Sequence, residues 1–150
     1  MKADRVMRLE VVTVPPELKV ESAHALMLRR SLRHLPVVSG GRLAGVVSDR
    51  DLLLVSGRLK NGTYVYPNLT VGEVMSLSPF SAAPSTSVAE IALTMASEKI
   101  DCVPIVTGEN ELVGLVTSTD LMLILAELPR EDRPPFSFQI HRAGDIEAKA

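Results

Sequence analysis

The sequence predicts an α+β fold made of two copies of one β-α-β-β-α unit, because segments of its first half recur in its second half at a constant spacing. Val6-Met7 returns as Val74-Met75. Leu35-Pro36-Val37 returns, at the same distance along the chain, as Val103-Pro104-Ile105. Each copy alternates β-branched runs with helical patterns. A unit of roughly fifty residues buries too little surface to be stable alone, so we expect the copies to share a core around a pseudo-two-fold axis.

The elements of the first unit follow from apolar spacing and from its turns. They are a strand over 11–14, a helix from 20 to about 33, strands over 35–38 and 43–47, and a helix from 49 to about 59. Pro15-Pro16 ends the first strand, because proline lacks the N–H that a sheet needs. The turn at Ser39-Gly40-Gly41 is so short that the two later strands must form an antiparallel hairpin.

The second unit repeats this order. Its predicted elements are a first strand over 80–83, a helix from 87, strands over 103–106 and 112–116, and a helix from 117 to Pro129. Ser87 and Glu90 have the spacing of a capping box, whereas Lys19 stands at the equivalent place in the first unit. The first strand has weak β propensity, so we expect it to be irregular.

These patterns divide the chain into four parts. We expect a first repeat over 3–60, a linker over 61–70, a second repeat over 71–128 and a C-terminal tail over 129–150. Tyr64 and Tyr66 in the linker are expected to pack rather than to carry function. In the tail, residues 136–140 alternate apolar and polar side chains, which predicts a strand docked on its own domain or on a second copy.

Composition excludes several classes of function. The net charge is −2 with interspersed signs and aromatic residues make up 3%, which argues against nucleic-acid binding. The longest apolar run is too short to span a bilayer, and the N-terminus lacks a signal-peptide pattern, so we expect a cytoplasmic protein without membrane association. The single Cys102 excludes an internal disulfide and is expected to be a buried, inert thiol. The three His have no metal-ligand spacing, and no catalytic constellation is present, so no enzyme activity is expected.

One strand-to-helix junction occurs in both units. Gly45 precedes Ser48 and Asp51 in the first, and Gly114 precedes Thr117 and Asp120 in the second. One interpretation is a capping box, in which hydroxyl and carboxylate satisfy the first amides of the helix. The other is a nucleotide site, because a helix N-terminus favours phosphate and an acidic side chain can accept from ribose hydroxyls. The sequence alone leaves both interpretations open.

The paired units, the two hydrophobic-Pro stretches and the two Gly-x-x-Ser/Thr-x-x-Asp junctions resemble cystathionine-β-synthase (CBS) domains in tandem, a Bateman module, over roughly residues 3–128. The resemblance implies that the repeats pack through their sheets and leave two clefts for adenosine-type ligands. It also implies frequent pairing of modules into homodimers. It places Asp51 and Asp120 on ribose and Ser48 and Thr117 on phosphate or ribose. The implied adenine contacts come from the main chain of the hydrophobic-Pro strands and from the first strands, at Leu35, Val37, Val103, Ile105, Thr13 and Ser81.

One difference between the two junctions is a basic residue. Arg50 lies inside the first and Thr119 inside the second, so a phosphate-rich ligand should prefer the first, unless Arg50 is only a solvated helix residue. The sequence therefore predicts a regulatory module that binds an adenine nucleotide, needs no obligatory cofactor and acts on an unknown effector protein. The alternative is a ligand-free module of the same fold that serves dimerisation and partner docking.

Overall fold

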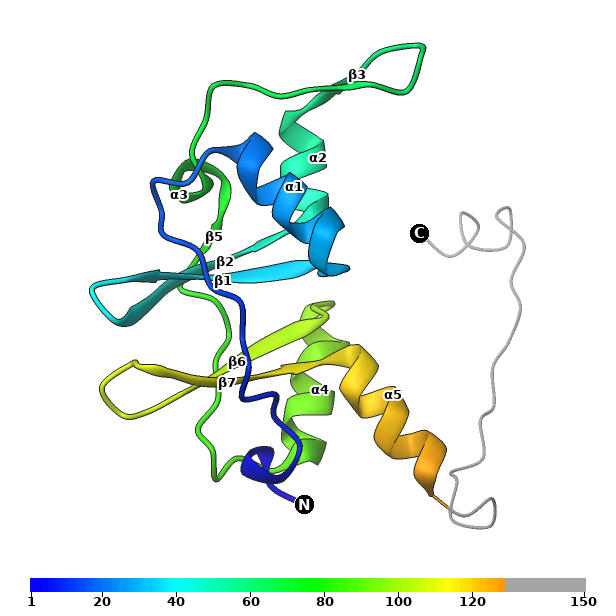
Figure 1. Cartoon of the computed structure of the whole chain (residues 1–150). Coiled ribbons are helices and arrows are strands. Elements are labelled where there is room, and N and C mark those ends of the chain that lie inside the picture. Colours follow the sequence, from blue (N-terminus) through cyan, green and yellow to red (C-terminus); the bar gives the residue numbers. More distant parts are fainter. Residues whose placement is uncertain (129–150) are drawn as a thin grey trace, which may run out of the picture.

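Each half of the chain folds into an antiparallel hairpin with helices on its outer side, in a computed structural model that describes residues 1–128. The first half contains α1 (Val20–Arg30), β1 (His34–Ser39), β2 (Arg42–Ser48) and α2 (Asp49–Val55). The second contains α4 (Val88–Glu98), β6 (Cys102–Val106), β7 (Leu112–Thr117) and α5 (Ser118–Glu127). The two hairpins face each other at the centre of the molecule, with α1 and α2 on one side and α4 and α5 on the other (Figure 1). The predicted α+β fold of two repeats packed through their sheets is confirmed.

The two hairpins share their register. Pro36 pairs with Val46 in the first, and Pro104 pairs with Leu115 in the second. In both, the register shifts directly after the strand residue that follows this proline, which indicates the same bulge in each copy. The duplicated sequence therefore folds as a duplicated structure, down to its irregularities.

Each repeat is completed by a segment from the other half of the chain. The 3₁₀ helix η1 (Ala3–Arg5) lies in the core of the second repeat, where the fully buried Ala3 joins a cluster with Ile91 and Val103. The short helix α3 (Val71–Val74) lies in the core of the first repeat through Val71. The strand β5 (Ser76–Leu77) that follows it pairs with the edge of β2. The residues after η1 and after α3 lead from these cores to the interface between the repeats, and we call the two stretches, 3–14 and 71–82, the crossed segments (Figure 1). Residues of both stretches line hollows there.

The structure corrects three element boundaries. The first strand of each repeat is reduced to one parallel bridge, Val14 with Val37 and Ala82 with Ile105; for the second repeat, this agrees with the irregular strand that was expected there. The first helix ends at Arg30, because Ser31 turns into the left-handed region at φ 53°. The helix predicted to reach about 59 ends at Val55, and the chain turns into a small hairpin of β3 (Gly57–Arg58) and β4 (Tyr64–Val65). Gly57 is a poor helix former, and the antiparallel pairing satisfies its backbone instead.

The linker tyrosines pack on the first helix, as predicted. The ring of the buried His24 meets Tyr64 and Tyr66 edge-on at centroid distances of 5.3 and 5.6 Å. Nδ1 of His24 also shares a hydrogen bond with the Tyr66 hydroxyl. This cluster fastens the linker to the first repeat. The strand predicted over 136–140 lies outside the described residues.

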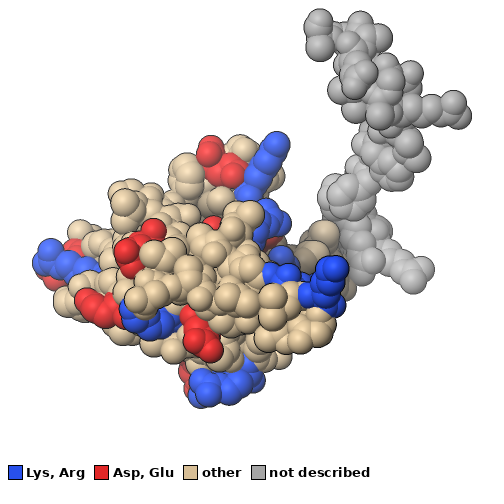
Figure 2. All heavy atoms as spheres, turned by 90° about the horizontal axis from the view of Figure 1, so that it is seen from above, with Lys and Arg blue, Asp and Glu red and all other residues tan. Residues whose placement is uncertain are grey.

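The charged side chains are mixed over the face seen from above the first repeat. Figure 2 shows Lys and Arg interspersed with Asp and Glu around an uncharged centre. Within residues 1–128, no helix has the length and apolar character that crossing a membrane requires.

Candidate functional site

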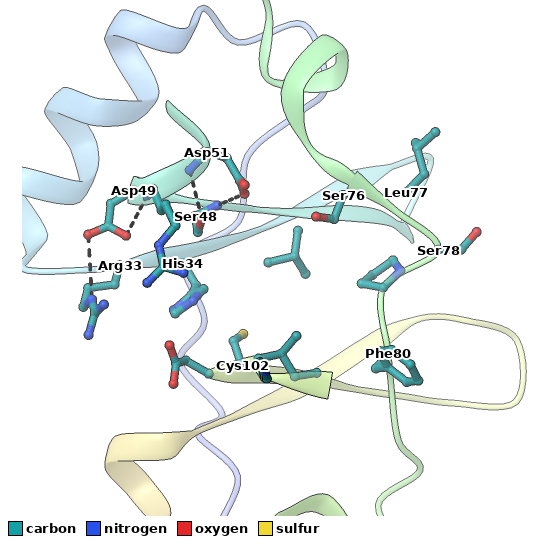
Figure 3. Close-up of a pocket in the computed structure, with 16 residues that line it drawn as sticks. Arg33, His34, Ser48, Asp49, Asp51, Ser76, Leu77, Ser78, Phe80 and Cys102 are labelled. Carbon is teal, nitrogen blue, oxygen red and sulfur yellow. Dashed lines mark hydrogen bonds and ion pairs between the residues drawn. The ribbon is translucent and has the colours of Figure 1, made fainter. Parts of the chain in front are cut away.

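A cleft of about 380 Å³ opens between the two repeats, and four separate segments line it. They are the start of β1 with the residue before it, the β2–α2 junction, β5 with the residues after it, and the turn between α4 and β6. The lining side chains come from Arg33, His34, Val46, Ser48–Asp51, Ser76–Phe80 and Lys99–Cys102. In Figure 3 the junction side chains lie on one side of this space, with Phe80 and Cys102 across from them. The cleft therefore exists only when both repeats are packed together.

The β2–α2 junction is a capping box that faces this cleft. The Ser48 amide donates to Oδ2 of Asp51 at 2.8 Å, and the Asp51 amide donates to Oγ of Ser48 at 3.1 Å (Figure 3). Among the described residues, no donor reaches the other carboxylate oxygen, Oδ1. The capping interpretation is thus confirmed, and it leaves half of the Asp51 carboxylate available to a ligand.

Charges of both signs line the cleft. Arg33 approaches Asp49 at 3.7 Å, a long and mostly exposed ion pair. Within residues 1–128, no carboxylate pairs with Arg50, whose side chain is exposed at the mouth of the cleft. Arg50 can therefore meet an anionic group without giving up a partner.

Burial sets the protonation of two further lining groups. Desolvation lowers the pKa of His34 below its ordinary value, despite the opposing charges of Asp101 and Asp49, so the ring is neutral at pH 7. Desolvation raises the pKa of the Cys102 thiol to about 12, so it stays protonated. Cys102, with Ile100 and Phe80, gives the cleft an uncharged patch across from the junction, and the charged Lys99 and Asp101 adjoin this patch.

The equivalent junction of the second repeat is closed by an arginine. Oδ2 of Asp120 accepts from the amide and the hydroxyl of Thr117, at 2.9 and 2.7 Å. Oδ1 is contacted by Nε and Nη2 of Arg8, at 2.8 and 2.7 Å. Burial alone would raise the pKa of Asp120, but the hydrogen bonds from Arg8 and Thr117 outweigh it and lower the pKa. Asp120 is therefore an ionised, almost fully buried carboxylate whose two oxygens are both occupied.

The structure distributes the predicted site residues over three environments. Ser48, Arg50 and Asp51 line the cleft. Thr117 and Asp120 form the junction that Arg8 closes. The remaining residues are divided by burial. The side chains of Leu35, Val37, Val103 and Ile105 are buried in the cores, so only their main chain could touch a ligand. Thr13 and Ser81 are exposed. Thr13 lines a smaller hollow of about 230 Å³ beside Val38 and Gly114.

The sequence analysis missed several residues that line the cleft, and it missed Arg8. Phe80, Lys99, Ile100 and Asp101 reach the first junction only because the second repeat packs against the first. A sequence signal did exist for Arg8. It follows Val6-Met7 where Ser76 follows Val74-Met75, so the repeat comparison already exposes the difference.

Comparison with known proteins places this geometry in a family. The CBS domain family matches residues 3–57 and 71–127. The inosine-5'-monophosphate dehydrogenase of Korarchaeum cryptofilum is 34% identical over 120 residues, which are 80% of this chain but only 23% of the enzyme. CBSX2 in complex with AMP superposes with a TM-score of 0.70 at 26% identity, over 84% of this chain and 96% of that one. The cytosolic domain of the Mg²⁺ channel MgtE in complex with ATP has a TM-score of 0.67 at 29% identity, over 82% and 48% of the two chains.

Proposed function

Because this chain belongs to the CBS domain family and carries the domain twice, we propose that it is a regulatory module that senses an adenosine-type nucleotide. The candidates are AMP, ADP, ATP, NAD and S-adenosylmethionine. The module has no catalysis of its own and passes its ligand state to a partner protein. The observation that carries the proposal is the interrepeat cleft, which presents Oδ1 of Asp51 and the guanidinium of Arg50, neither of which has a partner among residues 1–128.

The lining of the cleft suits the parts of a nucleotide. Oδ1 of Asp51 accepts from a ribose hydroxyl, and the Ser48 hydroxyl donates beside it. Arg50 pairs with a phosphate at the mouth. The uncharged patch formed by Ile100 and the half-exposed Phe80 accepts the adenine ring, whose faces stack on apolar and aromatic side chains. Polar and apolar groups thus lie on the sides that this ligand class requires.

The relatives support the same ligand class. CBSX2 and the MgtE cytosolic domain, both at least a quarter identical to this chain, have structures in complex with AMP and ATP. The dehydrogenase relative is an enzyme, but this chain spans only 23% of its length.

Calorimetry with the five candidate ligands tests the proposal. We expect one of them to bind the full chain below millimolar concentration, and Asp51→Asn to weaken that binding about tenfold, the value of one lost charged hydrogen bond. Asparagine still accepts from the Ser48 amide, so the cap is kept. Asp4→Asn is the matched control, because it removes the same charge from η1, which contributes nothing to the lining. Absence of binding, or unchanged binding in Asp51→Asn, would refute the proposal.

A second candidate function is protein interaction, and the outward helix faces favour it. Leu28, Leu54, Leu93, Met122 and Leu123 are each more than half exposed on the four long helices. Where exposed apolar side chains adjoin one another on a surface, they suit a homodimer or an effector contact. Light scattering over a concentration series measures dimerisation. A dimer that shows no melting shift with any nucleotide would identify an interaction module with empty clefts.

A further inference from the structure

We infer that Arg8 determines how many nucleotides the module binds, because it occupies the ribose-recognising carboxylate of the second junction and restricts binding to the first cleft. The inference rests on the proposed function, since it assigns Asp51 and Asp120 the same role in two clefts. It differs from that function in naming the residue that makes the clefts unequal.

The Arg8–Asp120 contact leaves a ligand no acceptor at this carboxylate. Two guanidinium nitrogens meet Oδ1 at 2.8 and 2.7 Å, and Thr117 supplies two donors to Oδ2. A ribose hydroxyl would have to displace the guanidinium and so replace an ion pair with a hydrogen bond from an uncharged donor. Asp51 presents no such barrier, because its Oδ1 meets no donor from the described residues.

Main-chain hydrogen bonds to β7 position Arg8 beside Asp120. The Arg8 amide donates to the Leu115 carbonyl at 2.8 Å, and the Leu115 amide donates back at 3.1 Å. The preceding residue, Met7, lies directly over Gly114. Further back, Ala3 is buried in the core of the second repeat. The guanidinium is therefore held by a segment that is built into the fold, although its own side chain is 53% exposed.

At the first junction, a serine takes the place that Arg8 has at the second. Ser76 pairs with Val46 on β2 as Arg8 pairs with Leu115 on β7. Ser76 lines the open cleft, and its short side chain makes no hydrogen bond to Asp51 within the described part of the chain. The two repeats thus carry matched carboxylates, and one side chain in the crossed segments decides which of them is accessible.

Calorimetry with AMP and with ATP on the full chain counts the sites. We expect the wild type to bind one nucleotide and Arg8→Gln to bind two, with affinity at the second site raised at least about tenfold. In Arg8→Gln combined with Asp51→Asn, only the first site should weaken, by about tenfold, and the second should keep its affinity. Arg5→Gln is the matched control, because it removes the same charge from the adjoining η1 turn and should leave the count at one. If Arg8→Gln fails to fold, Arg8→Lys keeps the charge but contacts the carboxylate with one nitrogen, and it should already reveal a weaker second site.

The outcomes separate this inference from the proposed function. One site in a folded Arg8→Gln or Arg8→Lys protein, or two sites of similar affinity in the wild type, would overturn the role of Arg8. In either case, binding that Asp51→Asn weakens would still uphold the proposed function. No binding of AMP, ATP or the other candidates to any variant would overturn both.

Discussion

Replacing Gly45 with alanine should destabilise the wall of the open cleft, because β5 lies against β2 at this glycine. A Cβ at Gly45 would come within 2.6 Å of the Ser76 carbonyl oxygen and within 2.6 Å of Sδ of Met75. The methionine can rotate away, but the carbonyl belongs to the pairing of β5 with β2 and cannot move without loosening it. Gly45→Ala therefore separates two strands rather than displacing one side chain.

The equivalent substitution in the second repeat, Gly114→Ala, provides a comparison for the size of this destabilisation. At Gly114 the three nearest atoms all belong to the Met7 side chain, at 2.5, 2.8 and 3.0 Å. Overpacking costs about 1–3 kcal/mol of unfolding free energy. We expect a cost of about 2 kcal/mol for Gly45→Ala and of less than about 1 kcal/mol for Gly114→Ala. For a chain of this length, about 2 kcal/mol lowers the melting temperature by about 4–8 °C.

Thermal and urea unfolding of two double-mutant cycles tests this reasoning. Met7→Ala should remove most of the cost of Gly114→Ala, because it deletes two of the three obstructing atoms. Met75→Ala should leave most of the cost of Gly45→Ala, because the Ser76 carbonyl stays. If Met75→Ala rescues Gly45→Ala as fully as Met7→Ala rescues Gly114→Ala, the carbonyl is not the obstacle and the argument is wrong.

Three further predictions concern single groups. Because the pKa of Asp120 is lowered in the folded state, the unfolded chain takes up this proton first as the pH falls. The stability that Asp120 adds is therefore full above about pH 3.9 and is lost as pH falls through the lowered pKa. Urea unfolding should show a smaller difference in unfolding free energy between wild type and Asp120→Asn at pH 3 than at pH 7, and an equal difference would contradict this. Cys102, with its pKa raised to about 12, should resist iodoacetamide at pH 8 and react once urea unfolds the chain, and rapid labelling of the folded protein would show an accessible thiolate. Tyr66→Phe should cost about 1–2 kcal/mol in urea unfolding by leaving buried His24 without its partner, whereas Tyr64→Phe, which keeps the ring contact, should cost less.

Local pattern was sufficient for the hairpins and for the capping boxes. The bonds between Ser48 and Asp51, and between Thr117 and Asp120, join residues three apart, so their spacing in the sequence specifies them. The strand expected over 11–14 was predicted less well, because it makes only one parallel bridge, Val14 with Val37. The strand over 80–83 was expected to be irregular from its weak β propensity, and its single bridge, Ala82 with Ile105, agrees with that expectation.

By itself, the sequence determined the duplication, the α+β class and the two capped junctions, because a repeat and a capping box depend on spacing along the chain. Only the tertiary structure decided that one junction opens on a cleft while the other is closed. That outcome depends on Arg8 reaching Asp120 across 112 residues and on Ser76 occupying the matching position beside Asp51. Both contacts arise where the crossed segments pack between the repeats, and proximity there is set by how the two cores assemble.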